Sequence, residues 1–304
     1  MDLRQLSALM AVADHGGFSA AADALHTVQS NVSSHVARLE RDLGATLVDR
    51  QAGRLTAEGA LVVARARRVR GELEGLVADL AALRDEIVGP SRLGMIGTTA
   101  RWLVPRLLDH LGERYPGIRL IVLDATSTSL EPQLLAGGLD LAVINLPVPG
   151  RDLATEALFD EDLVLVTPVE HPFTRRGLIT MGDLATIELL LPPPGTAFRG
   201  ELDAAAAAAG VFLRPLAELD GLRLIASMAM EGHGPAIVPA TAVSGYPESG
   251  RWAQVPVSGL PRRQVGVAQR RRGLPAAPSR AVLEVLREIA RLPDVPGLHP
   301  PRAA

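Results

Sequence analysis

Four polar side chains between residues 29 and 34 have the chemistry that reading DNA bases requires. They are Gln29, Ser30, Ser33 and Ser34. A glutamine amide can make paired hydrogen bonds to adenine, and a serine is short enough to contact a base edge or a phosphate without holding the backbone away. Side chains of this kind read a groove only if one helix presents them together, so the surrounding elements decide the interpretation.

Those elements are two short helices joined by a tight turn. The pattern predicts a helix over 19–25, a turn over 26–28 and a second helix from Gln29 to about Leu43. Gly44 should end the second helix, because glycine suits the left-handed C-terminal position. The apolar residues expected on the buried face of this helix are Val32, Val36, Leu39 and Leu43. An ordinary surface helix pair whose serines face water is the alternative interpretation.

The flanking segments favour DNA binding. Residues 3–13 predict an amphipathic helix that completes a three-helix core. Residues 47–50 and 54–55, with a glycine turn at Gly53, predict a small hairpin beside that core. The arginines that we expect to bind the DNA backbone are Arg38, Arg50 and Arg54. The N-terminal module is therefore predicted to be a winged helix-turn-helix.

A long helix follows, for which Thr56 is the expected cap. Its apolar residues alternate at spacings of four and three: Val62, Ala66, Val69, Leu73, Leu76, Leu80, Leu83 and Ile87. This heptad pattern favours pairing between the helices of two subunits over a helix buried in its own chain. Gly89-Pro90 should end the helix. The arginines between 65 and 70 indicate either a solvated helix face, which we favour, or a run that binds phosphates.

The remaining chain alternates strands and helices. The first expected strands are 93–98, 118–124 and 139–144, with helices over 101–114 and 130–136 between them. This order predicts parallel strands covered by helices, and such sheets bind ligands at the carboxyl ends of strands and at helix N-termini. The residues at those positions are Thr98, Thr99, Ser127, Thr128 and Asn145. Each alone could cap a helix or satisfy a turn, but together they predict an effector site.

A second α/β unit begins near Leu163. Its expected elements are 163–167, 199–209 and 222–230, after which 264–268 and 279–291 return the chain to the first unit. Arg199, beside Thr196, could bind a carboxylate through two hydrogen bonds or could form a surface salt bridge. His233, between two glycines, could shape its turn or touch a ligand. These features lean towards a small anionic effector.

Composition excludes several classes of protein. The 304 residues, 47% of them hydrophobic, are enough for about two domains. There is no cysteine, and all 31 basic residues are arginine, so a pyridoxal-phosphate aldimine cannot form on these residues. We find no Gly-x-Ser-x-Gly motif and no histidine pair with metal-ligand spacing. We therefore expect no enzyme, no cofactor and no metal. With no signal peptide or bilayer-spanning run, the expected location is the cytoplasm.

Several segments resemble the LysR-type transcriptional regulators. MDLRQL, AAADALH, RLERDLG and RLTAEG, with Gln29 and Ser33 among them, match the N-terminal signature of that family in order and spacing. LLAGGLDLAVI and MAMEGHGPAIVP are similar to segments of its effector-binding half.

The chain departs from the family pattern at three positions near the DNA-reading helix. Val28 stands where the family usually has Ser, Ser30 where it often has Pro, and Val48 where it customarily has Phe. Because a valine cannot cap the helix through its side chain, Thr27 is the expected substitute.

The resemblance implies an α/β protein with an N-terminal winged helix-turn-helix, a long linker helix and a two-subdomain effector domain similar to periplasmic binding proteins. The expected divisions are 1–58 for DNA binding, 59–89 for the dimerisation helix and 90–304 for the effector domain. Within the last, subdomain I takes about 90–161 and 267–292, subdomain II about 162–266, and a loose tail 293–304.

The resemblance also implies the partners. They are double-stranded DNA carrying an inverted repeat, a small-molecule effector bound between the subdomains, and further copies of the chain in a homodimer or homotetramer. Two alternatives remain open on the sequence alone. One is an architectural DNA-binding protein whose C-terminal half assembles subunits and binds no ligand, and the other is an unusual catalytic domain tethered to DNA.

Overall fold

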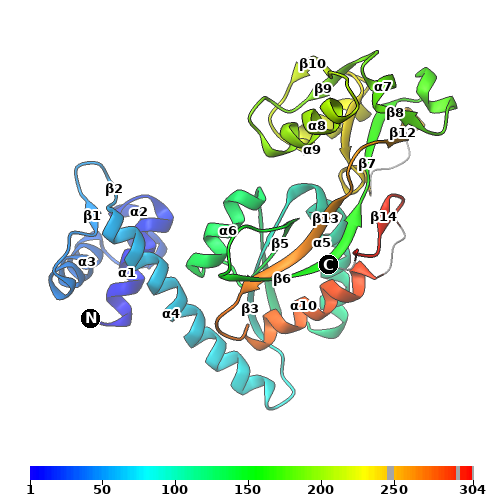
Figure 1. Cartoon of the computed structure of the whole chain (residues 1–304). Coiled ribbons are helices and arrows are strands. Elements are labelled where there is room, and N and C mark those ends of the chain that lie inside the picture. The colour runs from blue at the N-terminus through cyan, green and yellow to red at the C-terminus, as the bar shows by residue number, and fades with distance from the viewer. Residues whose placement is uncertain (245–249, 292–294, 303–304) are drawn as a thin grey trace.

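The chain folds into a small helical domain, a long helix and an α/β half with two six-stranded sheets (Figure 1). This computed structural model describes residues 1–244, 250–291 and 295–302. The helical domain contains α1 (Leu3–His15), α2 (Phe18–Ala24) and α3 (Gln29–Leu43). Asp2 caps α1 in a reciprocal pair with Gln5, and the core is formed where the apolar faces of the three helices meet.

Helix α3, which is predicted to read DNA, begins and ends where the sequence predicts, but its start is held differently. Val28 is the N-cap and supplies no side-chain hydrogen bond. The hydroxyl of Thr27 accepts from the side-chain amide of Asn31 at 3.0 Å, so the prediction that Thr27 caps the backbone is wrong. Gly44 is left-handed, as predicted. Leu43, expected to be buried, is 41% exposed because it lies in the last turn, beyond the contact with α1 and α2.

The predicted wing is present. Strands β1 (Val48–Asp49) and β2 (Arg54–Leu55) pair antiparallel, and Gly53 takes the positive φ of 65° that their turn needs. The side chain of Glu40 on α3 accepts the N–H groups of Leu47 and Val48. The wing is therefore attached directly to α3.

The linker helix α4 (Ala57–Ala82) is shorter than predicted. Thr56 caps it as expected, accepting the N–H of Gly59 at 2.9 Å. The helix ends at Ala82 rather than at Gly89-Pro90, because the chain reverses through Asp85, at φ 61°, and Glu86 donates back to Ala81. Leu83 is the C-cap, so Leu83 and Ile87 lie outside the helix that was predicted to carry them.

The first sheet contains five longer strands and a short edge strand, in the order β14-β6-β13-β5-β3-β4. These strands are β3 (Gly89–Met95), β4 (Ile118–Asp124), β5 (Leu141–Leu146), β6 (Leu153–Glu161), β13 (Arg263–Arg270) and β14 (Leu298–His299). Strands β3, β4 and β5 run parallel, as predicted, but β13 is antiparallel to both of its neighbours. The sheet is therefore mixed, and β6 is a strand that the sequence pattern did not reveal.

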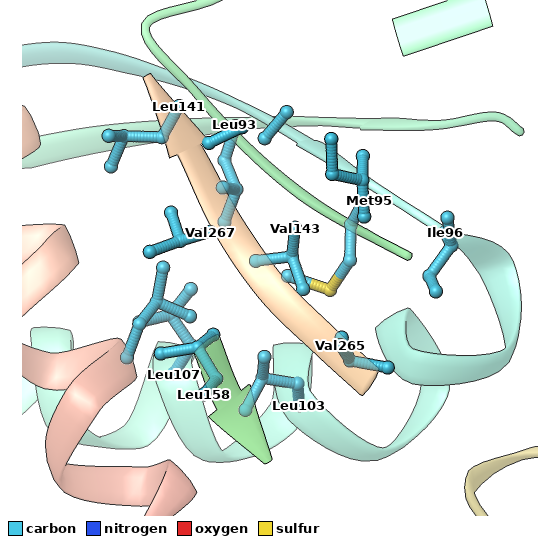
Figure 2. Packing of buried hydrophobic residues seen from close by; sticks show 14 of the residues in the cluster. Leu93, Met95, Ile96, Leu103, Leu107, Leu141, Val143, Leu158, Val265 and Val267 are labelled. Carbon is cyan, nitrogen blue, oxygen red and sulfur yellow. The ribbon is translucent and has the colours of Figure 1, made fainter. Parts of the chain in front are cut away.

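Helices α5 (Gly97–Arg114), α6 (Ser127–Ala136) and α10 (Ala277–Ala290) belong to this first subdomain. Figure 2 shows Leu103 and Leu107 of α5 against the strand residues Val143 and Val265. All four side chains are fully buried. This packing fixes the N-terminal end of α5 relative to the carboxyl ends of the parallel strands.

The second subdomain is built on the other sheet, in the order β10-β9-β11-β7-β12-β8. Its strands are β7 (Leu163–Pro168), β8 (Ile179–Thr180), β9 (Glu188–Leu191), β10 (Arg214–Glu218), β11 (Ala236–Pro239) and β12 (Trp252–Ser258). Its helices are α7 (Met181–Leu184), α8 (Ala197–Ala208) and α9 (Leu222–Met230), with short 3₁₀ turns η1 (Pro172–Arg175) and η2 (Ala240–Ala242). The chain crosses between subdomains twice, from β6 to β7 and from β12 to β13 (Figure 1).

Two expectations about the end of the chain change. The return strand pairs with the first sheet from Arg263 onwards, so we place its boundary there rather than at 267. Residues 295–302 do not form a loose tail: Leu298 and His299 pair with β6, and Arg302 contacts Asp160 at 3.0 Å. Residues 293–294 and 303–304 of that tail, and residue 292 before it, lie outside the described part. Within that part, no helix is both long and apolar enough to cross a bilayer.

Candidate DNA-binding face and effector site

Helix α3 presents two chemically different faces. Val32, Val36 and Leu39 are fully buried against the rest of the helical domain. The opposite face carries the residues predicted to read DNA: Gln29, Ser30, Ser34 and Arg38 are exposed, and Ser33 is half-buried. A helix with this division is held by its apolar side and can present its amide, hydroxyl and guanidinium groups to a groove.

Arg50 joins the wing to α3 and is more engaged than a free phosphate-binding arginine. Its Nη1 donates to Ser33 Oγ at 3.0 Å, and its guanidinium lies 5.1 Å from the ring centre of Phe18. A second nitrogen is 3.9 Å from Glu40. Arg54, at the start of β2, is exposed. The structure therefore gives Arg50 a positioning contact with the reading helix and leaves Arg54 open on the wing.

The tip of the wing is ordered by Asp49. Its carboxylate accepts the N–H groups of Gln51 and Ala52, both at 3.0 Å. Those two backbone hydrogen bonds, the one from Ala52 first, hold the pKa of Asp49 below its usual value. The carboxylate thus remains ionised and keeps the turn before Arg54 in shape.

The arginine run on α4 makes contacts within the chain. Arg67 pairs with Asp14 of α1, and Arg68 donates through Nε to the carbonyl of Leu135 on α6 at 3.1 Å. Arg70 lies 3.9 Å from Glu74 on its own helix. These contacts weigh against the interpretation of this run as a phosphate-binding segment.

The structure brings together the five predicted ligand residues of the first subdomain. Thr98 and Thr99 lie in the first turn of α5 rather than in a strand, and both are buried. Ser127 and Thr128 begin α6. Asn145, near the end of β5, donates its backbone N–H to Ser127 Oγ at 3.1 Å. Both helices thus start at the carboxyl ends of parallel strands, where ligands of α/β sheets bind.

Two of these side chains have polar atoms without a hydrogen-bond partner among the described residues. They are Thr99 Oγ1 and Asn145 Oδ1, and both atoms are buried. Buried polar atoms are normally paired, so each is a position where a ligand or water would be stabilised.

An ion pair that the sequence did not reveal joins the two subdomains at this place. Arg223, in the first turn of α9, contacts Asp124, the last residue of β4. Gly97, the first residue of α5, lies directly beside the pair. Asp124 follows the same strand-end rule as the predicted residues and could have been found by it. Nothing in the local sequence around Arg223 marks it.

The predicted ligand residues of the second subdomain lie apart from this place. Thr196 caps α8 by accepting the N–H of Arg199 at 3.3 Å. The guanidinium of Arg199 is taken by Asp203, Glu218 and the carbonyl of Pro192. Burial lowers the pKa of Arg199, but the hydrogen bonds that its guanidinium donates to Glu218 and Asp203 outweigh burial and hold that pKa above its ordinary value.

His233 follows the far end of α9, is largely exposed, and lies 3.8 Å from Glu231. It therefore does not face the start of α9, where Arg223 contacts Asp124. In the described ranges, no group of three or more potential ligands could hold a metal ion.

A winged helix-turn-helix, a linker helix and a two-subdomain α/β unit with strand-end polar residues together define a DNA-binding regulator that responds to a ligand. Comparison with known families identifies which kind. Residues 84–291 match the LysR substrate binding domain, and residues 3–60 match the bacterial regulatory helix-turn-helix protein of the lysR family. The chain belongs to the LysR family of transcriptional regulators.

Similar proteins agree along the whole chain. The probable hydrogen peroxide-inducible genes activator of Streptomyces viridosporus is 34% identical, covering 97% of this chain and 95% of the relative. A full-length OxyR from Pseudomonas aeruginosa carrying a cysteine substitution has a TM-score of 0.76 at 28% identity, covering 100% of this chain and 99% of that one.

Full-length CbnR complexed with its target DNA has a TM-score of 0.68 at 26% identity, covering 96% of this chain and 99% of that one. The protein is thus a LysR-type DNA-binding transcriptional regulator with an effector-binding domain. Its relatives are regulators and not enzymes.

Proposed function

We propose that this regulator binds an inverted repeat as a homodimer or a dimer of dimers, with one α3 in the major groove of each half-site. The observation that carries the proposal is the exposed polar face of α3 beside the open Arg54 of the wing. Gln29, Ser30, Ser33 and Ser34 would meet base edges or nearby phosphates. Because DNA is the partner, the cytoplasm is the proposed compartment.

The dimer contact is proposed to run along α4. Leu73, Leu76 and Leu80 share the heptad pattern and remain exposed on this helix in the single chain. An exposed apolar stripe with this spacing is stabilised when a second helix covers it. The proposed division keeps residues 1–58 for DNA binding, 59–89 for dimerisation and 90–304 for the effector.

The proposed effector is a small anion bound where α5 and α6 begin. Support comes from the helix N-termini, the buried unpaired atoms of Thr99 and Asn145, and the nearby guanidinium of Arg223. Relatives are named for induction by hydrogen peroxide, and one solved relative carries a cysteine substitution. The 304 residues here contain no cysteine, so oxidation of a thiol in them is not the proposed trigger.

Selection of binding sites from random and neighbouring genomic DNA tests this function. The full chain should enrich two related half-sites in inverted orientation, and a footprint should cover both. Tight, salt-sensitive binding without enrichment would contradict sequence-specific recognition and favour an architectural role. Analytical ultracentrifugation with Leu76→Glu, compared with Leu178→Glu on a loop of the second subdomain with similar exposure, would test the α4 contact: only the first change should dissociate the dimer.

A further inference from the structure

The contact between Asp124 and Arg223 crosses from one subdomain to the other. Asp124 ends β4 of the first sheet, and Arg223 lies in the first turn of α9 in the second subdomain. In the described part of the chain, the covalent connections between the two subdomains are the two crossing segments near β7 and β13. An ion pair away from those crossings therefore affects how the subdomains are oriented towards each other.

Gly97 provides the space for this ion pair. A Cβ atom at Gly97 would lie 2.7 Å from Asp124 Oδ1 and 2.9 Å from Arg223 Nε. Gly97 does not need its positive-φ freedom here, so lack of space is the reason why a side chain would conflict. Both charged groups thus lie against the backbone at the very start of α5.

The charges at this place favour an anion. Neither α5 nor α9 has a side-chain cap, so the N–H groups of their first turns keep their partial positive charge. The guanidinium of Arg223 adds a full positive charge. Two residues into α5, the hydroxyl of Thr99 is fully buried and has no partner among the described residues. Among the described residues, the carboxylate that pairs with Arg223 at this place is that of Asp124.

We propose that Asp124 is an internal anion that occupies Arg223 and holds the two subdomains together until a carboxylate ligand replaces it. This inference rests on the proposed effector function and adds to it the ligand class and the competing group. The incoming carboxylate takes over the guanidinium and reaches the first-turn N–H groups of α5 and the hydroxyl of Thr99. Asp124 is then released, and the ligand becomes the bridge between the subdomains.

The first test measures the subdomain orientation directly. Because the chain has no cysteine, Glu113→Cys and Ala207→Cys place one spin label on an exposed position of each subdomain without background. Labelled full chains are diluted with unlabelled chains, and the distance between labels is measured by pulsed electron paramagnetic resonance. Since Arg223 is 61% exposed, we expect Asp124→Asn to change the ratio of closed to open molecules by about two- to fivefold.

Gly97→Ala provides an independent perturbation that keeps both charges. The added methyl group must displace the ion pair, so the distance distribution should change as it does in Asp124→Asn. The matched control is Gly112→Ala in the same helix, where no atom lies within 4 Å of the added Cβ. Distributions that are identical in wild type, Asp124→Asn and Gly97→Ala would overturn the proposal.

The second test measures competition, with acetate as the probe at constant ionic strength. The fluorescence of Trp102, buried in α5, can report binding in a Trp252→Phe background. Asp124→Asn should bind acetate about two- to fivefold more tightly than the parent, and Arg223→Gln should bind it more weakly. No saturable response in Asp124→Asn, or weaker binding, would overturn the proposal. Site-specific DNA binding by the wild type and by the same variants is measured separately. Absence of site-specific binding by the wild type would refute the proposed function, and not this proposal.

Discussion

Replacing Gly59 with alanine should disturb the junction between the wing and the linker helix. Gly59 lies in the first turn of α4, and a Cβ there would be 1.9 Å from the backbone oxygen of Leu47. An ordinary contact begins at 3.4 Å, so backbone atoms must separate by about 1.5 Å. The same oxygen accepts the N–H of Thr56 at 3.0 Å, and that hydrogen bond would lengthen as well. We expect local stability to fall by about 2–3 kcal/mol, which overpacking against backbone typically costs.

The assay is hydrogen exchange of residues 46–60 in the full chain, with DNA affinity measured in parallel. Gly71→Ala is the matched control, because it lies in the same helix with nothing within 4 Å of its added Cβ. That change should stabilise α4 by up to about 1 kcal/mol, since alanine is the better helix former. Gly59→Ala should speed exchange on both sides of the junction and weaken DNA binding. Equal exchange in the two variants would refute the argument that α4 is packed directly on the base of the wing.

Three further changes test single side chains. Arg54→Ala should weaken binding to all DNA sequences and reduce the salt slope by about 1, whereas a change in sequence preference alone would contradict its place on the wing. Gln29→Ala should cost about 1–3 kcal/mol at the preferred site and spare random DNA, and equal loss on both would refute base reading. Burial raises the pKa of Glu161. At a pH between the usual pKa of a glutamate and this raised pKa, the folded state therefore holds a proton that the unfolded state has lost. The free energy of unfolding should fall as the pH rises through that range. Glu161→Gln should remove that decline of stability with pH, measured by thermal denaturation, because the amide oxygen can still accept from Thr241 but the side chain no longer titrates. An unchanged pH profile would show that the buried carboxyl is not the source of the decline.

Local patterns predicted most of the DNA-binding part, with the Thr27 cap and the burial of Leu43 as exceptions. The start and end of α3, its buried stripe and the wing turn depend on residues close together in sequence, such as Gly44 and Gly53. The predicted end of α4 was wrong because it relied on local spacing alone. Leu83 and Ile87 continue the apolar spacing, but spacing cannot show that the chain reverses at Asp85. A repeat of apolar residues indicates which face would be buried and not how far the helix extends.

Contacts between distant parts of the chain could not be predicted. Strand β6 was missed because its buried end carries Asp160 and Glu161, which resemble loop residues until Gln264 and Thr241 are seen to bind them. Arg199 and Arg223 show the same limit, since both lie near a helix start. Arg199 donates hydrogen bonds to Glu218 and Asp203 of its own subdomain. Arg223 forms an ion pair with Asp124 of the other subdomain. No local signal in the sequence distinguishes the two arginines.

Helix α6 lies between the predicted effector residues and the linker helix. At its start, Ser127 accepts the backbone N–H of Asn145. At its end, Gly137 takes a positive φ of 79° and comes so close to Arg68 of α4 that a Cβ would lie 2.7 Å from that side chain. Arg68 also donates to the carbonyl of Leu135 in the last turn of α6. Ten residues of helix, about 15 Å, thus connect the strand ends to α4.

The neighbouring arginine on α4 extends this connection to the DNA-binding domain. Arg67 pairs with Asp14 of α1, so consecutive side chains of one helix bind the effector half and the helical domain. A rigid helix cannot absorb a displacement of α6 along its length. Any movement of α6 must therefore either carry α4 and its contact with Asp14 or break the hydrogen bonds of Arg68. Through these contacts, the proposed ligand exchange at the strand ends would have a physical means of changing the position of α3.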